Sequence, residues 1–583
     1  MLLEKINSPK DLKTLKVEEL DSLSKEIRNA LLYKISKKGG HASPNLGMVE
    51  MTVALHYVFD APKDKIVFDV SHQAYTHKIL TGRAKNFLNE ELFDEITGFT
   101  DSNESEYDLF NIGHTSTSLS LACGLAKARD CRGGNENVIA VIGDGSLSGG
   151  EAYEGLNNII ESGTNMIVIV NDNEMSIAEN HGGLYRNLAE LRQTNGKAQN
   201  NFFSSLGFEY IYLEEGHNYK KLIEVFEKVK DSKKPVVVHI HTIKGKGYEF
   251  AEQNKETWHF SGPFDVKSGK RLFGLGRESY SSKTRDYLLQ EMKTNKNLVV
   301  ITSGTPSVLS FSKQYRDIAG DRFVDVGIAE EHAVAFASGI AKNGGDPVYA
   351  VYGTFLQRCY DQLSQDLCVN KNPATILLFS DSVYGMNDVA HLGLFDIPLI
   401  SNIPNLVFLA PTCENEYFAM LDWSIKQKEH PVAIRVPCDR LFTREIEKHD
   451  YSDLDKSEVV LQGKDVAIFA LGNFFKVGQM IAQKLKDANI NATLINPRYI
   501  SGIDKTLLDK LSKNHKLIIT LEDGMVEGGF GQKIASYLGD KNILVKNYGI
   551  QKSFPDRYNP VQLLKENEID VDNICEYIKS KLN

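Results

Sequence analysis

Short apolar runs recur along the chain at intervals that leave room for a helix between them. Several runs are continuously apolar rather than alternating, which is typical of parallel strands buried on both faces of a sheet. Because strands that alternate with helices build β-α units, the pattern predicts an α/β fold with doubly wound, mostly parallel sheets. Ligands of such sheets bind beyond the carboxyl ends of the strands. The runs are 137–145, 165–173, 235–242, 297–304, 374–381, 405–411, 465–472, 492–498 and 516–524.

Two polar segments interrupt this pattern and divide the chain. The segment 261–286 is rich in Gly and Ser, and the segment 444–458 is polar and charged. A chain of 583 residues is also too long for one hydrophobic core. We therefore predict three doubly wound domains with one linker. Their predicted bounds are 1–265 for the first domain, 266–285 for the linker, 286–450 for the second domain and 456–583 for the third.

Composition and charge exclude several classes of protein. The net charge is −10 and no dense Lys/Arg patch interleaves with aromatic residues, which argues against a nucleic-acid partner. No apolar run approaches the roughly eighteen residues that a membrane span needs, and the first fifteen residues do not resemble a secretory signal. The seven cysteines form no C-x-x-C pair, which is typical of a reducing cytoplasm and indicates neither a zinc site nor a redox dithiol.

The stretch 141–177 offers the clearest candidate chemistry. Its first apolar run breaks at a GDG turn over 143–145, and its second ends in an NDN triplet over 171–173. One β-α-β crossover separates Asp144 from Asn173, so both side chains can reach one point at neighbouring strand ends. Carboxylate and amide oxygens suit Mg²⁺, and a helix that begins just after the GDG turn would point its amino end at a phosphate. The alternative is a pair of ordinary solvated turns, since turns often use Gly and Asp.

A GDG turn followed about thirty residues later by NDN resembles the thiamine-diphosphate-binding motif of that enzyme superfamily. Neighbouring segments extend the resemblance to the 1-deoxy-D-xylulose-5-phosphate synthase family, whereas related transketolases match these segments less well. The segments that carry the resemblance are 7–15 (NSPKDLKTL), 39–83, 105–130, 324–339 (VDVGIAEEHAVAFASG), 352–363 (YGTFLQRCYDQL) and 527–531 (EGGFG).

The resemblance covers nearly the whole chain and implies both a fold and an activity. The fold would be transketolase-like, with three α/β domains, and the enzyme would work as a homodimer in the cytoplasm. Its cofactors would be thiamine diphosphate and Mg²⁺. Its substrates would be pyruvate and an aldehyde, D-glyceraldehyde 3-phosphate, which condense to 1-deoxy-D-xylulose 5-phosphate with release of CO₂. Such a transferase serves isoprenoid and thiamine biosynthesis.

The resemblance also implies which residues hold the cofactors. Asp144, Asn173 and the backbone carbonyl of Met175 would bind Mg²⁺. Glu330 would bond the aminopyrimidine ring nitrogen and promote its imino tautomer, and a glutamate within an apolar segment is otherwise a costly burial. Phe355 would pack on the pyrimidine. The other cofactor contacts implied by matching motifs are His72, Gly113, His114, Thr115, Gly145, Ser146 and Tyr248.

Five histidines lie in matching motifs, and histidine carries protons near neutral pH. His41, His72 and His391 are the foremost candidates for catalysis. His114 and His259 are the other two of the five. The implied catalytic set also contains Glu330, His259, Tyr352 and Arg358, and Tyr352 and Arg358 would lie near the acceptor. Three further histidines close to these motifs are interpreted as structural: His56, His77 and His332.

The chain departs from the family pattern where the family binds the phosphate of the acceptor. The family uses two arginines of the second domain there. In this chain Ser382 replaces one arginine and Cys438 replaces the other, while Asp439 replaces the glycine that follows. Serine and cysteine cannot supply a fork of charged donors, so this change weakens phosphate binding unless Arg435 or Arg440 compensates.

Smaller departures lie near the cofactor motifs. Ser71 replaces a glycine before His72, and Glu331 replaces the usual glutamine after Glu330. The segment 179–203 is also much shorter than the lid-like insertion that the family carries, which predicts a change in access or closure.

Three alternatives stay open at this point. The first is a transketolase-like ketol transfer, or a related condensation with a different acceptor, whether phosphorylated or not. The second is a dinucleotide-binding dehydrogenase, although no G-x-G-x-x-G turn with an acid about twenty residues later is evident. The third is a non-catalytic paralogue that binds the cofactor for structure or regulation, against which Glu330 argues.

Overall fold

The computed structural model describes residues 2–272, 278–438 and 440–582 of the chain. These residues form two compact units. The first unit holds Met1–Arg277 with Gly327–Ala329, and the second holds Glu278–Val326 with Glu330–Asn583. No helix among the described residues is long and apolar enough to span a membrane.

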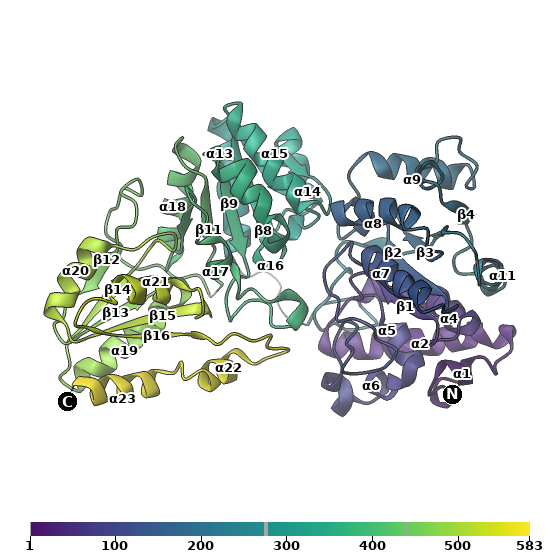
Figure 1. Cartoon of the computed structure of the whole chain (residues 1–583), viewed down its shortest axis with the longest axis horizontal. Coiled ribbons are helices and arrows are strands. Elements are labelled where there is room, and N and C mark those ends of the chain that lie inside the picture. The colour runs from purple at the N-terminus through teal and green to yellow at the C-terminus, as the bar shows by residue number, and fades with distance from the viewer. Residues whose placement is uncertain (1, 273–277, 439, 583) are drawn as a thin grey trace. The chain divides into compact units, whose positions relative to one another are not determined.

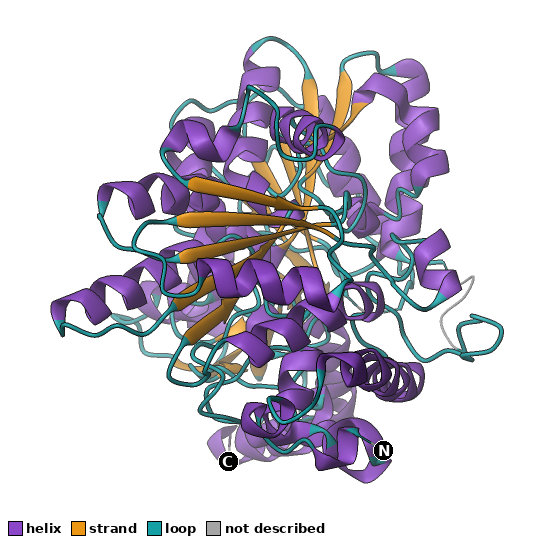
Figure 2. Cartoon of the chain, turned by 90° about the vertical axis from the view of Figure 1, so that its right-hand side faces the viewer, coloured by secondary structure: helices purple, strands orange, loops and turns teal. Residues whose placement is uncertain are grey.

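The first unit is built on a five-stranded parallel sheet in the order β1-β2-β3-β5-β4 (Figure 1). Figure 2 shows the twisted fan of its strands with helices on both sides. The strands are β1 (Lys65–Phe68), β2 (Val138–Gly143), β3 (Ile167–Asp172), β4 (Glu209–Leu213) and β5 (Val236–His241). The helices are α1 (Pro9–Leu12), α2 (Val17–Lys38), α3 (Ala42–Gly47), α4 (Val49–Val58), α5 (Tyr75–Lys78), α6 (Lys85–Leu88), α7 (Ser118–Cys131), α8 (Gly150–Glu161), α9 (Gly183–Gln193), α10 (Phe202–Leu206), α11 (Tyr219–Val229) and α12 (Glu249–Gln253). Short 3₁₀ and π turns are η1 (Leu3–Lys5), η2 (Ile79–Arg83), η3 (Glu90–Glu95) and η4 (Gly145–Ser148).

The second unit contains two sheets, of which the first has six parallel strands in the order β10-β11-β9-β8-β6-β7. Its strands are β6 (Leu298–Thr302), β7 (Phe323–Asp325), β8 (Asp346–Tyr352), β9 (Thr375–Phe379), β10 (Val407–Leu409) and β11 (Val432–Arg435). Its helices are α13 (Tyr280–Thr294), α14 (Lys313–Ala319), α15 (Glu330–Lys342), α16 (Gly353–Leu356), α17 (Asp396–Ile400) and α18 (Glu414–Lys426). Its 3₁₀ and π turns are η5 (Pro306–Leu309), η6 (Gly320–Arg322), η7 (Gln357–Cys359), η8 (Gln362–Cys368) and η9 (Val389–His391).

The last sheet has the order β12-β14-β13-β15-β16, and its strands are parallel except for β12 at one edge. Its strands are β12 (Glu458–Leu461), β13 (Val466–Ala470), β14 (Ala492–Asn496), β15 (Leu517–Met525) and β16 (Leu544–Ile550). Its helices are η10 (Gly472–Phe474), α19 (Phe475–Asp487), α20 (Lys505–Asn514), α21 (Phe530–Tyr537), α22 (Pro560–Glu566) and α23 (Val571–Leu582).

Continuously apolar strands have both faces covered, as the sequence predicts. Along β2, Val141 belongs to the core on one face of the sheet, and Ala140 and Ile142 belong to the core on the other. Because neither face meets water, no polar residue needs to alternate with the apolar ones. The prediction of an α/β fold with three doubly wound, mostly parallel sheets is therefore confirmed.

The two sheets of the second unit share one hydrophobic core. Ile376 and Leu378 of β9 lie in the same buried cluster as Ala467 and Phe469 of β13. This shared core explains why three sheets form only two compact units. The domain bounds inferred from the sequence stay predictions. The helix α13 begins inside the predicted linker, because Ser279 caps it by accepting the Ser282 N–H at 3.2 Å.

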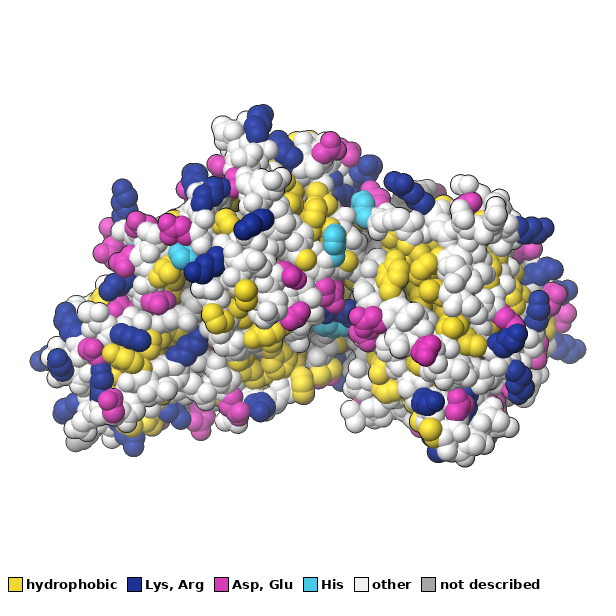
Figure 3. Space-filling model, turned by 45° about the horizontal axis from the view of Figure 1, so that its top comes forward, with side chains coloured by type: hydrophobic (Ala, Val, Ile, Leu, Met, Phe, Trp, Pro, Cys, Tyr) yellow, Lys and Arg dark blue, Asp and Glu magenta, His cyan; other side chains and the backbone are white. Residues whose placement is uncertain are grey.

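On the face shown in Figure 3, basic side chains lie interspersed with acidic and uncharged ones rather than in one dense patch. A continuous basic surface is the usual electrostatic footprint of a nucleic-acid-binding protein. This face therefore gives no support to a nucleic-acid partner.

Candidate active site

The GDG turn and the NDN triplet lie side by side at the carboxyl edge of the first sheet. Strands β2 and β3 are parallel neighbours, with Gly143 opposite Asn171. The backbone N–H of Asp144 donates to the Asn171 carbonyl at 3.0 Å. The spacing of Asp144 and Asn173 in the sequence thus corresponds to adjacent strand ends, as expected for one β-α-β crossover.

The oxygens at this edge are suited to a hard cation. Asp144 is 1% exposed, and burial together with the nearby Asp172 carboxylate raises its pKa to about 7. The Oδ1 atom of Asn173 is buried without a hydrogen-bond partner, as is the Oδ1 atom of Asn180. Asn180 also donates from Nδ2 to Asp144 Oδ2 at 2.6 Å. A divalent cation would satisfy these oxygens and favour the ionised carboxylate, so the residues fit Mg²⁺.

The chemical types of these oxygens indicate which metal ion would suit the site. No group of three or more His, Cys, Asp or Glu side chains suited to a metal occurs in the described part of the chain. One carboxylate with amide and carbonyl oxygens is instead typical of Mg²⁺, which completes its shell with water and phosphate oxygens. Met175 lies in a tight turn closed by a bridge to Glu179, beside Asn173 in the sequence.

Close packing explains the glycines around the GDG turn. A Cβ atom on Gly145 would lie 2.8 Å from Ser176 Oγ, and one on Gly149 would lie 2.1 Å from Ser116 Oγ. Ser116 donates its hydroxyl to the Ser146 carbonyl at 2.8 Å. These contacts bring the GDG turn against the segment that follows Gly113-His114-Thr115, so two of the predicted diphosphate-binding turns meet.

Asp69 holds the turn that contains Gly113, His114 and Thr115. It is fully buried directly after β1, and its two oxygens accept the N–H groups of Ser116 and Ser118 at 2.9 and 3.0 Å. Burial raises the pKa of Asp69, although the two backbone bonds act in the opposite direction. The sequence did not lead us to single out Asp69. Its position directly after an apolar strand was the feature that could have identified it.

The shortened segment 179–203 packs on the GDG turn rather than forming a long insertion. The Tyr185 hydroxyl lies 3.2 Å from the carbonyls of both Asp144 and Gly145. Arg192 forms an ion pair with Asp172, which also accepts a hydrogen bond from His239 Nε2 at 2.8 Å. The segment therefore braces the strand end that carries the predicted metal ligands.

Three of the predicted histidines gather in the first unit. The His41 ring lies 4.9 Å from the His72 ring and 5.7 Å from the His259 ring, and His72 lies 5.2 Å from His259. Burial, and after it the Lys244 cation, holds the pKa of His259 well below its usual range. We call His41, His72 and His259 the histidine cluster.

Asn45 and Lys244 support the histidine cluster, and the sequence reading missed both. Asn45 is fully buried, and its Nδ2 donates at 2.7 Å to the carbonyls of both His41 and His72. Lys244 is 2% exposed, lies 3.3 Å from His259 Nδ1 and donates to the Ser176 carbonyl. Burial lowers the pKa of Lys244 to about 7, although the Asp144 carboxylate opposes this.

Tyr248 lies near the cluster in the sequence but uses its polar atom elsewhere. Its hydroxyl donates to the Val266 carbonyl at 3.1 Å, and its ring packs against Trp258 and Phe264. The histidines interpreted as structural also form a separate group. His56 Nε2 lies 2.9 Å from His77 Nδ1, and His77 Nε2 lies 2.9 Å from Asp108.

The second unit brings together the other predicted residues. Glu330, at the start of α15, is 3% exposed, and its Oε2 atom is buried without a hydrogen-bond partner. Burial raises the pKa of Glu330 to about 7, which the Arg358 cation partly opposes. A carboxyl group with an unsatisfied oxygen and a pKa near neutrality is suited to exchange a proton with a ring nitrogen.

A second group in this unit is aromatic. The Phe355 ring lies 6.1 Å from the Tyr352 ring and 5.7 Å from the His391 ring. His391 Nδ1 lies 3.0 Å from Asp388 Oδ1, which orients its imidazole. This bond also lowers the pKa of Asp388, although burial acts in the opposite direction. Phe355 and His391 therefore line the same part of the unit.

The positions that the resemblance assigns to phosphate-binding arginines lie in or beside a buried polar network. Ser382 is fully buried and donates to Asp523 at 2.5 Å. Arg435 is 3% exposed and donates to Asp396 at 2.6 Å and to Asp523. The two carboxylates neutralise the guanidinium, so Arg435 is not available to bind phosphate. The idea that it compensates for the missing arginines is thus not supported.

Two further positions border this network. The backbone N–H of Cys438 donates to Asn473 at 3.0 Å, and Asn473 donates to Asp523 at 2.8 Å. Asp439 lies outside the described residues, and Arg440 is exposed. We call Ser382, Asp396, Arg435, Asn473 and Asp523 the Arg435 network.

Three family models together match most of the chain. The family model described as 1-deoxy-D-xylulose-5-phosphate synthase matches residues 3–199 and 194–242. Models of the pyrimidine-binding and C-terminal domains of transketolase match residues 279–442 and 455–574.

Relatives of full length carry the same name. The 1-deoxy-D-xylulose-5-phosphate synthase of Caldanaerobacter subterraneus subsp. tengcongensis is 40% identical, over 99% of this chain and 98% of the relative. That of Clostridium acetobutylicum is 37% identical, over 99% of each chain. A solved transketolase from Campylobacter jejuni is 16% identical with a TM-score of 0.44, over 97% of this chain and all of that one.

Proposed function

The chain belongs to the 1-deoxy-D-xylulose-5-phosphate synthase family, and from this premise we propose how its residues carry out the reaction. It is a transferase that condenses pyruvate with D-glyceraldehyde 3-phosphate to 1-deoxy-D-xylulose 5-phosphate and releases CO₂. It uses thiamine diphosphate and Mg²⁺. When bound, thiamine diphosphate supplies a nucleophilic carbon and an electron sink for the decarboxylation.

Asp144, Asn173 and the Met175 carbonyl hold Mg²⁺ at the carboxyl edge of the first sheet. The observation that carries this assignment is the buried Asn173 Oδ1, which has no partner within the protein and lies beside the Asp144 turn. The two neighbouring turns, with Gly145 and Ser146 in one and Gly113 to Thr115 in the other, offer N–H groups to the diphosphate.

Glu330 would hold a proton for the aminopyrimidine of the bound cofactor, and Phe355 would pack against that ring. The support is the buried, unpartnered Oε2 atom and a pKa raised to about 7, which let the carboxyl group hold a proton near neutral pH. Without a partner this burial is costly, so the ligand that satisfies Glu330 also stabilises the fold.

The histidine cluster moves protons on the substrate side. Three imidazoles within 6 Å of one another, with Lys244 beside His259, can pass a proton and stabilise developing negative charge. In the second unit, His391 is assigned a separate proton-carrying role, and Asp388 orients its imidazole. Tyr352 and Arg358 are assigned to the acceptor, and Tyr248 is assigned a supporting role beside the cofactor.

A second candidate is the same chemistry with an unphosphorylated aldehyde. It is favoured by the Arg435 network, in which the guanidinium is already neutralised by Asp396 and Asp523. A phosphate dianion near these carboxylates would meet repulsion instead of a charged fork of donors.

One experiment tests both candidates. Purified protein with Mg²⁺, thiamine diphosphate and pyruvate is given either D-glyceraldehyde 3-phosphate or D-glyceraldehyde, and CO₂ and the ketose product are measured. Release of CO₂ with formation of the phosphorylated ketose supports the main proposal. A clear preference for D-glyceraldehyde supports the second candidate, and no CO₂ with either aldehyde contradicts both.

We further propose that the enzyme is a cytoplasmic homodimer. A groove of about 680 Å³ runs along α15, and its lining combines the apolar Phe336 and Ile340 and several glycines with the polar Asn297, His332 and Asn343. Such a surface is suited to pack against a second copy. The seven cysteines are all free thiols, as expected in a reducing compartment. Light scattering coupled to gel filtration measures the mass directly, and a monomer would contradict the dimer.

A further inference from the structure

A long loop without helix or strand lies beside the histidine cluster. It spans residues 97–112 and leads from η3 to the turn at Gly113. Loops longer than about 12–15 residues without their own secondary structure are uncommon and are usually functional or disordered. We call residues 97–112 the strap, and its contacts show that it is firmly held.

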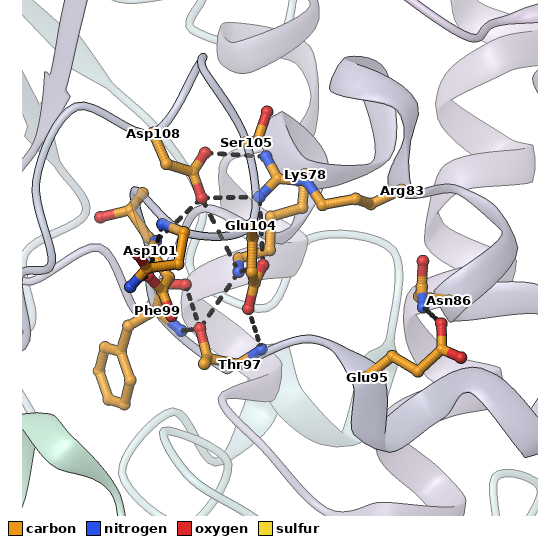
Figure 4. Close-up of polar contacts among 12 residues, drawn as sticks. Lys78, Arg83, Asn86, Glu95, Thr97, Phe99, Asp101, Glu104, Ser105 and Asp108 are labelled. Atoms are coloured by element: carbon orange, nitrogen blue, oxygen red, sulfur yellow. Dashed lines mark hydrogen bonds and ion pairs between the residues drawn. The ribbon is translucent and has the colours of Figure 1, made fainter. Parts of the chain in front are cut away.

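Buried ion pairs anchor the strap (Figure 4). Asp108 is 3% exposed and accepts two hydrogen bonds from Arg83, at 2.6 and 2.8 Å. It also accepts the backbone N–H of Asp101 at 2.9 Å and bonds His77. Glu104 pairs with the fully buried Lys78, so the strap is tied to the helical turns that follow His72.

One side chain joins the strap to the turn that carries His72. Ser71 is fully buried, donates its hydroxyl to the Ile112 carbonyl at 2.8 Å and accepts the Thr100 N–H at 2.8 Å. The hydroxyl thus bridges two separate points of the strap. Family members have a glycine at this position, which offers no such hydroxyl.

The turn itself is strained. Val70 has φ 58° and Ser71 has φ 65°, so two consecutive non-glycine residues adopt the left-handed region. This conformation is unfavourable for a β-branched residue and persists only where surrounding contacts hold it. The bonds from Ser71 to the strap are such contacts, and His72 follows directly.

The strap also contributes a ring to the histidine cluster. Phe99 lies 5.7 Å from the His41 ring in an edge-to-face arrangement. The His41 and His72 carbonyls are joined by Asn45, so a shift of the turn would be felt at both histidines. Movement of the strap would therefore change the surroundings of His41 and the position of His72 together.

We propose that Ser71 is a positioning residue of the histidine cluster. Its hydroxyl fastens the strap to the strained turn, which fixes His72 relative to His41 and keeps Phe99 against His41. The kinetic part of this inference rests on the proposed function, whereas the structural part does not. The Ser71 hydroxyl thereby restrains a turn whose backbone a glycine would leave more flexible.

Two variants and a matched control test the proposal. S71A keeps the Cβ atom but removes both hydroxyl bonds, and S71G removes them while tolerating φ 65° without strain. S102A removes a serine hydroxyl from the exposed part of the same strap, where it donates to Asn111 Oδ1 at 2.8 Å. Hydrogen exchange of peptides covering 97–112, melting temperature, thiamine diphosphate affinity, kcat and KM are measured for each.

We expect both Ser71 variants to lose strap protection and turnover. Exchange at Thr100 speeds up about tenfold and kcat falls about tenfold, as expected for the loss of one well-formed hydrogen bond. KM changes less than about twofold, whereas cofactor affinity falls together with kcat, because His72 and the turn after Ile112 are also assigned to the cofactor. S102A leaves kcat and exchange at Thr100 unchanged.

The other outcomes overturn the proposal. Unchanged exchange in S71A and S71G would show that the hydroxyl does not hold the strap. Faster exchange with wild-type kcat, measured well below the melting temperature, would leave Ser71 only a structural role. A loss of kcat in S71A that S71G does not share would assign the effect to backbone strain. If the wild-type protein releases no CO₂, the proposed function fails, while the exchange data still decide the link between Ser71 and the strap.

Discussion

The carboxyl edge of the first sheet, where Asp144, Asn173 and Asn180 form the proposed metal edge, differs from the Arg435 network of the second unit in how completely its buried polar atoms are paired. At the metal edge, Asn173 and Asn180 each have a buried oxygen without a partner, and burial raises the pKa of Asp144 to about 7. In the Arg435 network the guanidinium is paired with two carboxylates. A cation would satisfy the unpartnered oxygens of the first region. In the second region Arg435 is paired, and the unpartnered oxygens belong to the neighbouring buried Asp381, which is a carboxyl group and not a phosphate-binding cation.

This difference separates the cofactor from the acceptor as sources of specificity. Unsatisfied buried oxygens are costly, so they indicate that the protein is built around a missing charge. Arg435, which is already paired with two carboxylates, gives no comparable sign that a charged ligand binds there. The chain therefore keeps residues suited to Mg²⁺ and diphosphate, whereas Ser382 and Cys438 stand where the resemblance implies phosphate-binding arginines.

The most severe way to break the metal edge is D144N. Asparagine keeps the shape of the side chain but not the charge, so we expect turnover below detection and Mg²⁺ affinity lowered more than about 100-fold. Titration of Mg²⁺ and thiamine diphosphate by intrinsic fluorescence measures this. D60N, at a side chain that is 59% exposed, is the matched control and should bind normally. Normal Mg²⁺ binding by D144N would remove Asp144 from the ligand set.

Replacing Glu330 tests the proton exchange assigned to the second unit. E330Q should lower kcat by roughly 10²–10⁴-fold, the range for loss of a general acid–base group, while the protein still folds and binds the cofactor. E331Q is a close control, because it restores the glutamine usual in the family and should leave kcat nearly unchanged. Wild-type turnover by E330Q would contradict the assignment.

Removing the guanidinium tests whether the Arg435 network is structural. R435M leaves the buried carboxylates of Asp396 and Asp523 without a counter-ion, and we expect a loss of about 3–5 kcal/mol in the free energy of unfolding. Denaturant unfolding measures this loss. R132M, at a side chain that is 63% exposed, should be close to neutral. A small effect of R435M would show that the network is not closed.

Restoring one family arginine sharpens the comparison. C438R should raise the preference for D-glyceraldehyde 3-phosphate over D-glyceraldehyde about tenfold in kcat/KM, because a charged hydrogen bond contributes roughly 1.5–3 kcal/mol. C438S removes the thiol without adding charge and should leave the preference unchanged. An unchanged preference in C438R would mean that the Asp523 carboxylate captures the new guanidinium, or that the phosphate lies elsewhere.

A last prediction concerns the pH dependence of stability without the cofactor. Burial raises the pKa of Glu330 to about 7 from an unfolded value near 4.5. The folded state therefore binds more protons between these values, and stability falls as the pH rises from about 4.5 to 7, by at most about 1.4 kcal/mol per pH unit. E330Q should lack this part of the dependence in denaturant unfolding. Identical profiles for both proteins would contradict the raised pKa.

Much of the fold was predictable because burial on both faces of a sheet leaves a clear pattern. Continuous runs such as 137–145 and 516–524 mark β2 and β15 without any knowledge of their neighbours. The pairing of Asp144 with Asn173 followed from the length of one crossover. The start of α13 was harder to place, since it depends on the cap that Ser279 provides within a Ser-rich segment.

The supporting residues of the site were not predictable, because their roles depend on contacts far apart in the chain. A lysine after a strand suggests a solvated side chain, yet Lys244 is buried beside His259. An asparagine in a helical turn gives no sign that it joins two distant carbonyls, as Asn45 does. Arg435 seemed available in the sequence, and only the fold brings two aspartates to it.

The core shared by the two sheets of the second unit has a consequence for how this gene can be rearranged. Ile376 and Phe469 are buried in the same cluster, so separating the chain near residue 450 would expose apolar surface on both fragments. The first unit has hydrophobic clusters of its own. We therefore expect a split gene, a circular permutation or an exchange between relatives to be tolerated near residues 266–279. The last 130 or so residues, in contrast, need the preceding sheet to bury their apolar surface.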